Sequence, residues 1–169
     1  MRQVRQNVFE TNSSSSHSLV VTKTDRHYTD EEIRKYLDYR IDDDGLIKLY
    51  SDEAYFGRSP FQILSTFKDK MMYAYACAAM INEEDIVTEA VREFIPEVNG
   101  IKYDRKYQCI GTDDCLLFGW LADAGVTLVE FLSNDKYKVI CDGDEYCIWS
   151  DAKKSGLINL DFIEEEYCL

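Results

Sequence analysis

Residues 61–80 read FQILSTFKDKMMYAYACAAM, the longest part of the chain in which apolar residues recur at helical spacing. Such a pattern places apolar side chains on one face of an α-helix that packs in a core. Ser59 can cap this helix and Pro60 fits its first turn, so we expect a central core helix over about 60–80. We interpret its Met and aromatic side chains as packing residues rather than a cofactor site. The apolar positions are Phe61, Ile63, Leu64, Phe67, Met71, Met72 and Tyr75.

Shorter helices are expected on both sides of this one. Thr29 precedes a helical pattern and Glu32 follows three residues later, which is the spacing of a capping box. Gly125 separates two of the later helical segments. The expected later helices cover 82–94, 113–123 and 127–133.

Short β segments complete the pattern. The polar run TNSSSSHS at 11–18 is interpreted as a loop between two of them, and Asn99-Gly100 and Asp142-Gly143 are typical hairpin turns. Residues 161–169 alternate between acidic and apolar. The expected strands cover 3–10, 19–22, 46–50, 136–141 and 145–149. We therefore predict an α+β fold, with helices packed on a small, mostly antiparallel sheet, in a single domain over 1–169.

The composition fits a folded globular protein, with 46% hydrophobic and 30% charged residues among 169. No run of 18 apolar residues occurs, which argues against a membrane span and a membrane partner. The first residues lack the apolar core of an export signal. We therefore expect a cytoplasmic protein with reduced cysteines.

Charge divides the chain into two parts. The formal net charge is −13, so most of the surface should repel nucleic acid and attract basic partners. Residues 1–28 differ, because four bases stand there against two acids, a net of +2, which leaves −15 for the acidic α+β body over 29–169. The polar, basic N-terminal segment is therefore the part best suited to meet a phosphate.

Four cysteines form two similar pieces, CIGTDDC at 109–115 and CDGDEYC at 141–147. A four-thiolate zinc site of Cys109, Cys115, Cys141 and Cys147 is one interpretation. Zinc pairs usually have two to four residues between ligands, and here there are five. The alternative, which we favour, is a pair of turns with no metal.

The candidate site lies in the N-terminal segment. His17 can move a proton near neutral pH and Glu10 can orient it, which makes them a candidate acid/base pair. Arg2, Arg5 and Asn12 are candidates for binding a phosphate. The hydroxyl groups that complete this candidate catalytic set belong to Ser13, Ser14, Ser15 and Ser16.

These residue types suit phosphoryl-group chemistry or nucleotide binding, but a serine-rich loop with a solvated histidine has the same composition. Catalysis and plain binding therefore both remain open. A Gly-x-Ser-x-Gly elbow is missing, which argues against an acyl hydrolase. A Walker loop, a dinucleotide fingerprint and an HExxH motif are also missing, so we expect no cofactor.

Runs of acidic residues recur through the body of the chain. They can imitate a phosphate backbone and occupy the basic groove of a nucleic-acid enzyme, or they can be solvated turns and helix ends. For any single run we favour a solvated turn or helix end. For the electrostatic field of the whole protein we favour attraction to a basic partner. The runs are 42–44, 113–114, 142–145 and 164–166.

The segment NVFETNSSSSHSL at 7–19 resembles the opening of small proteins from Firmicute phages and plasmids, among them type II-A anti-CRISPR proteins. Some of these cause truncation of the guide RNA. The resemblance covers about 20 residues of the chain. It implies a mobile-element protein that acts in the cytoplasm of a bacterial host, with its shared site at Glu10, Asn12, Ser13–Ser16 and His17.

We therefore expect an anti-defence protein that inhibits a guide-RNA-dependent nuclease such as Cas9. Its partners would be that basic effector and its guide RNA, whose backbone the N-terminal loop would dock on or cleave. Two alternatives remain. One is an enzyme that binds or transforms a nucleotide or a small phosphorylated metabolite, and the other is a structural accessory protein of a phage.

Overall fold

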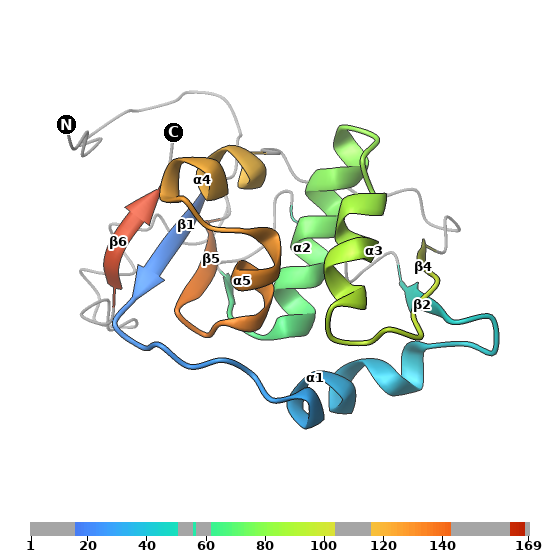
Figure 1. Cartoon of the computed structure of the whole chain (residues 1–169). Coiled ribbons are helices and arrows are strands. Elements are labelled where there is room, and N and C mark those ends of the chain that lie inside the picture. The colour runs from blue at the N-terminus through green and yellow to red at the C-terminus, as the bar shows by residue number, and fades with distance from the viewer. Residues whose placement is uncertain (1–15, 51–55, 57–61, 104–115, 143–162, 168–169) are drawn as a thin grey trace.

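Helix α2 (Phe67–Met80) lies at the centre of the fold. The computed structural model describes residues 16–50, 56, 62–103, 116–142 and 163–167 (Figure 1). Ten residues of α2 between Phe67 and Ala78 are buried, and they point in all directions around the helix. A helix covered on every side is a core helix, so the prediction of a central, packed helix is confirmed.

The predicted start of that helix is wrong. Thr66 is the N-cap: its hydroxyl accepts from the Asp69 amide at 3.1 Å, and the Asp69 carboxylate accepts from the Thr66 amide at 3.4 Å. Strand β3 (Gln62–Leu64) precedes the cap and pairs antiparallel with a strand formed much later in the chain. This distant partner, rather than local helical spacing, decides the conformation of 62–64. Ser59 and Pro60 lie outside the described residues.

The remaining helices agree with the predicted pattern, with shifted ends. Thr29 and Glu32 form the predicted capping box at the start of α1. The expected helix over 82–94 starts later, because Asn82 has a φ of 58° and ends the preceding turn. Residues 113–115 lie outside the described part. The helices are α1 (Asp30–Leu37), η1 (Asp38–Arg40, a 3-10 helix), α3 (Asp85–Arg92), α4 (Leu117–Ala124) and α5 (Leu128–Ser133).

Four antiparallel strands form the main sheet, in the order β3-β5-β1-β6. The strands other than β3 are β1 (Ser16–Thr22), β5 (Tyr137–Asp142) and β6 (Ile163–Tyr167). The predicted loop over 11–18 is therefore wrong for its last three residues, which extend β1 because β5 pairs with them. The expected strands 3–10 and 145–149, and Gly143 of the second hairpin, lie outside the described residues.

A second, parallel pair joins β2 (Leu46–Leu49) to β4 (Gly100–Tyr103). The hairpin predicted at Asn99-Gly100 is therefore wrong. The Asn99 amide donates to the Gly45 carbonyl at 2.7 Å, and its side-chain nitrogen donates to the Asp44 carbonyl at 2.8 Å. Asn99 thus attaches the start of β4 to the turn before β2 rather than reversing the chain.

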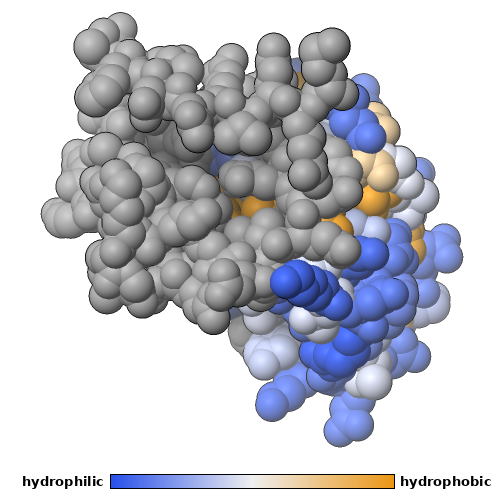
Figure 2. All heavy atoms as spheres, turned by 90° about the vertical axis from the view of Figure 1, so that its left-hand side faces the viewer, coloured by the Kyte–Doolittle hydropathy of each residue, from blue (hydrophilic) through white to orange (hydrophobic). Residues whose placement is uncertain are grey.

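One hydrophobic core takes residues from α1, α2, α3, α4, α5 and both sheets, so the predicted α+β fold with a mostly antiparallel sheet is confirmed. On the side where β6 and β1 lie, hydrophilic side chains gather over the lower part of the described surface (Figure 2). None of the helices in the described ranges is long and apolar enough to span a bilayer.

Candidate functional site

His17, the central residue of the predicted site, is a core residue of β1. Its Cα pairs with that of Cys141 on β5, and its Nδ1 lies 3.0 Å from the Tyr73 hydroxyl on α2. The two rings meet edge to face with centroids 5.6 Å apart. The His17 side chain is 4% exposed, which places it between sheet and helix rather than in a solvated loop.

Most of the other predicted site residues lie outside the described part of the chain. Ser16 is described as the first residue of β1. The structure brings His17 together with Tyr73 and Cys141, neither of which was predicted to act with it. The residues outside the described part are Arg2, Arg5, Glu10, Asn12, Ser13, Ser14 and Ser15.

Of the four cysteines in the zinc alternative, the structure describes Cys141 alone. Cys141 is buried in β5, and burial together with neighbouring Cys77 raises the pKa of its thiol. A protonated thiol is a poor metal ligand. Among the described residues, no group of three or more His, Cys, Asp or Glu side chains could hold a metal ion. Cys109, Cys115 and Cys147 lie outside that part.

The most unusual polar residue is Lys70, which the sequence did not single out. Its side chain is 0% exposed, and its ammonium donates to the Phe131 carbonyl at 2.6 Å and to the Asn134 carbonyl at 2.8 Å. The ammonium also lies over the rings of Tyr28 and Phe131, 5.0 and 5.3 Å from their centroids. Burial lowers the pKa of Lys70 to about 7, and Lys138 contributes to the shift.

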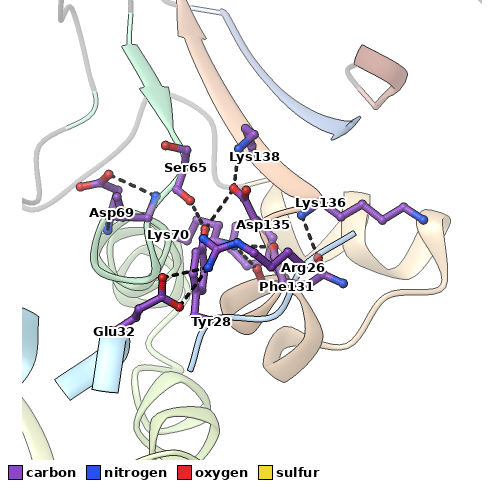
Figure 3. A network of polar contacts seen from close by, with 12 residues as sticks. Arg26, Tyr28, Glu32, Ser65, Asp69, Lys70, Phe131, Asp135, Lys136 and Lys138 are labelled. Atoms are coloured by element: carbon purple, nitrogen blue, oxygen red, sulfur yellow. Dashed lines mark hydrogen bonds and ion pairs between the residues drawn. The ribbon is translucent and has the colours of Figure 1, made fainter. Parts of the chain in front are cut away.

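Polar contacts surround this lysine (Figure 3). The Tyr28 hydroxyl donates to the Ser65 carbonyl and, at 3.4 Å, to the Asp135 carboxylate. Lys138 donates to the same carboxylate at 2.6 Å. Burial and Asp135 raise the pKa of Tyr28. The network therefore joins α2, the end of α5 and the start of β5 with the segment before α1.

Asn134 completes the junction on the other side of α5. Its side-chain nitrogen donates to the carboxylates of Asp25 at 2.7 Å and Glu130 at 2.9 Å. His27 lies beside it, with Nε2 at 3.4 Å from the Asn134 nitrogen and 3.8 Å from a Glu130 oxygen. Asn134 is 1% exposed, so these bonds hold the turn in place. The Lys70 and Asn134 contacts fit a structural junction, because the reactive amine of Lys70 is out of reach of solvent.

Helix α3 carries a second feature that the sequence analysis did not single out. Asp85, Glu89 and Glu93 follow one another at intervals of four residues, and all three are exposed. Within the described part of the chain, no ion pair joins any of them to a cation. The nearby Arg92 donates instead to the carbonyls of Val98 and Asn99, both at 2.8 Å. We call these three carboxylates the α3 acidic row.

Other acidic groups serve the fold. One carboxylate oxygen of Asp42 accepts from the amides of Asp44 at 3.1 Å and Leu46 at 2.9 Å, and these backbone hydrogen bonds lower the pKa of Asp42. Glu97 accepts two bonds from Arg34, which lower the pKa of Glu97. These carboxylates already have partners, whereas no cation among the described residues pairs with the α3 acidic row.

The chain matches no protein family model, and neither a curated protein nor a solved structure is significantly similar to it.

Proposed function

We propose that the protein inhibits a guide-RNA-dependent nuclease by placing its α3 acidic row in the basic channel of that enzyme. The observation that carries the proposal is the row itself, three exposed carboxylates spaced four residues apart from the first residue of α3 to its C-cap, none of which forms an ion pair with a cation among the described residues. The described residues hold 22 acids and 12 bases, a net charge of −10, so the surrounding field has the same sign. Such a surface attracts a basic channel and repels the nucleic acid that the channel normally holds.

The geometry of the row suits that partner. Residues four apart in an α-helix lie about 6 Å apart along the axis, so the row presents regularly spaced negative charges. A nucleic-acid strand also presents negative charges at a regular interval, and the lysines and arginines of a nuclease channel are arranged to meet them. A rigid helix needs little ordering on binding, which favours affinity.

The burial of His17 favours occlusion over cleavage of the guide RNA. A general acid or base must come within hydrogen-bond reach of the group that it protonates or deprotonates. His17 is 4% exposed and is bonded to Tyr73, which gives it a packing role. The acidic surface therefore carries the inhibition, and the guide RNA stays intact.

The test compares two sets of substitutions, each of which replaces three carboxylates by neutral amides and so removes the same negative charge. One set removes the row, through Asp85→Asn, Glu89→Gln and Glu93→Gln. The control set changes three exposed acids elsewhere, through Asp43→Asn, Asp44→Asn and Asp123→Asn. Purified effector with guide RNA is titrated with each protein while target DNA cleavage is measured. We expect the row variant to lose inhibitory potency by at least about tenfold and the control to change by less than about threefold.

Two results would overturn the proposal. Equal inhibitory potency of the row variant and the wild type would show that the row takes no part in inhibition. Shortened guide RNA on a denaturing gel, after incubation with the wild-type protein, would replace occlusion by cleavage. Circular dichroism of each variant confirms that the fold is retained.

A further inference from the structure

Exposed apolar side chains gather where α2 meets α3. Five large hydrophobic side chains are exposed among the described residues, and three of them lie here: Met80 at 51%, Ile81 at 44% and Ile86 at 38%. The other two, Tyr36 and Tyr50, each lie beside a cation, Lys35 and Arg40 respectively. We call Met80, Ile81 and Ile86 the α2–α3 corner.

The backbone of the corner is fixed by its own hydrogen bonds. The Glu83 amide donates to the Ala78 carbonyl at 3.0 Å and the Asn82 amide to the Ala79 carbonyl at 3.4 Å, which is the Schellman pattern of a helix end. Asn82 takes the left-handed conformation that this motif requires, with φ at 58°. In such motifs the residue at the position of Glu83 is frequently apolar and packs back on the helix. Here it is an exposed carboxylate, and the apolar side chains face solvent beside it.

Carboxylates frame the corner. Glu83 and Asp85 lie between Ile81 and Ile86 in the sequence, and Glu89 lies within one helical turn of Ile86; all three are exposed. Apolar side chains inside an acidic frame complement a surface that carries an apolar side chain between cations.

We propose that the α2–α3 corner is a docking point for a basic protein segment that carries an apolar side chain between lysines or arginines. The inference rests on the proposed function in one respect: the basic nuclease that binds the acidic row would also supply the basic segment that binds the corner. It adds an apolar anchor next to the row. The anchor makes part of the affinity independent of salt, since screening weakens charge pairs and leaves apolar burial largely unaffected.

Charge argues against the other occupants. A second copy of the chain, in a symmetric dimer, would place the same acidic frame against itself. A membrane with anionic headgroups and a nucleic-acid backbone would both meet like charge. A basic protein segment with an apolar side chain can pair with the carboxylates and also bury the apolar side chains of the corner.

The probes for the test are two short synthetic peptides with the same number of lysines. One carries leucines at helical spacing between the lysines, and the other carries glutamines in their place. Fluorescence anisotropy measures the binding of each to the full chain at about 0.15 M and about 0.5 M salt. We expect the Lys/Leu peptide to bind at least about tenfold more tightly than the Lys/Gln peptide at the higher salt.

Variants locate that preference. Met80→Gln, Ile81→Gln and Ile86→Gln together should bring the two peptides to within about threefold of each other. The control pair, Tyr36→Gln and Tyr50→Gln, should leave the preference unchanged. Equal binding of the two peptides to the wild type, or a preference that survives the triple change, would overturn the inference. So would concentration-dependent self-association that the triple change abolishes, because the corner would then be a dimer interface.

The nuclease assay separates this inference from the proposed function. A protein that prefers the Lys/Leu peptide at the corner and leaves the nuclease uninhibited refutes the proposed function alone. A protein that inhibits the nuclease and binds both peptides equally refutes the docking point alone.

Discussion

The Lys70 ammonium nitrogen lies 2.6 Å from the carbonyl oxygen of Phe131, at a position where the lysine side chain is 0% exposed. The same nitrogen lies 2.8 Å from the Asn134 carbonyl, so one cation binds two carbonyls at the C-terminal end of α5. Helix ends of this kind carry partial negative charge and favour a cation. Lys70 therefore links α2 to α5, although burying its amine carries a cost in desolvation free energy.

This contact predicts a pH dependence of stability. The pKa of Lys70 is lowered by burial from 10.5 to about 7 in the folded state and returns to 10.5 on unfolding. Between these values the unfolded chain binds more protons at this residue, so its contribution to folding improves as the pH rises. Lys70→Met removes that contribution. We expect the free energy of unfolding of the wild type, minus that of Lys70→Met, to increase by about 2 kcal/mol from about pH 7 to about pH 9.

Urea denaturation at each pH measures this difference. Subtracting the variant removes the effect of groups that both proteins share, including Tyr28 and Cys141, whose raised pKa values act at higher pH. A difference that stays constant over this range would show that Lys70 titrates as an ordinary exposed amine.

The Tyr28 hydroxyl is expected to stabilise the junction. Tyr28→Phe removes a donor to the Ser65 carbonyl and to Asp135, and we expect a loss of about 1–2 kcal/mol in the free energy of unfolding. Tyr36→Phe is the matched control, because Tyr36 is 41% exposed, and it should change stability by less than about 0.5 kcal/mol. Thermal unfolding compares the two, and equal shifts would contradict the role assigned to Tyr28.

The cap at Thr66 is expected to set the start of α2. Thr66→Ala removes the acceptor for the Asp69 amide, and we expect a loss of about 1 kcal/mol. Thr24→Ala, at an exposed position outside the helices, serves as the control. If both threonines gave the same small change in chemical denaturation, the capping box would contribute nothing to stability.

A side chain at Gly45 is expected to destabilise the protein more than one at Gly125. Its φ is +75°, and a Cβ there would come within 2.7 Å of both the Asn99 side-chain nitrogen and the Glu97 carbonyl oxygen. Gly125 has a similar φ of +67° with nothing within 4 Å of such a Cβ. Gly125→Ala therefore carries backbone strain alone, about 1 kcal/mol, and Gly45→Ala should cost about 1–2 kcal/mol more. Denaturation midpoints of the two variants test this, and equal losses would show that the turn moves aside.

A local signal in the sequence predicts the start of α1 correctly. Thr29 and Glu32 lie three residues apart, and the capping box that they predict is present in full. Thr66 and Asp69 have the same spacing, but Ser59-Pro60 offers an earlier start and Asp69 is not the Glu or Gln of the usual capping box. The row on α3 was also readable, since Asp85, Glu89 and Glu93 repeat at helical spacing.

Features that depend on distant pairing were out of reach. The local sequence around Asn99 is typical of a hairpin, but its amide donates to the Gly45 carbonyl. The local sequence around His17 is typical of a solvated loop, but β1 pairs with β5 and His17 contacts Tyr73 of α2. The core helix carries two cations, Lys68 and Lys70, and the sequence does not show that Lys70 is the buried one. Its two carbonyl partners come from residues more than 60 positions away, which no local pattern contains.

The order of strands in the main sheet has a consequence for biosynthesis. β1 is formed by residues 16–22, and its two neighbours by residues 137–142 and 163–167. While the chain emerges from the ribosome, the backbone N–H and C=O groups on both edges of β1 lack the partners that β5 and β6 later supply. The helices can form earlier from local contacts, whereas the sheet is complete only after residue 167 has left the ribosome. Slow translation of the final third would therefore lengthen the period in which a nascent chain is vulnerable to aggregation.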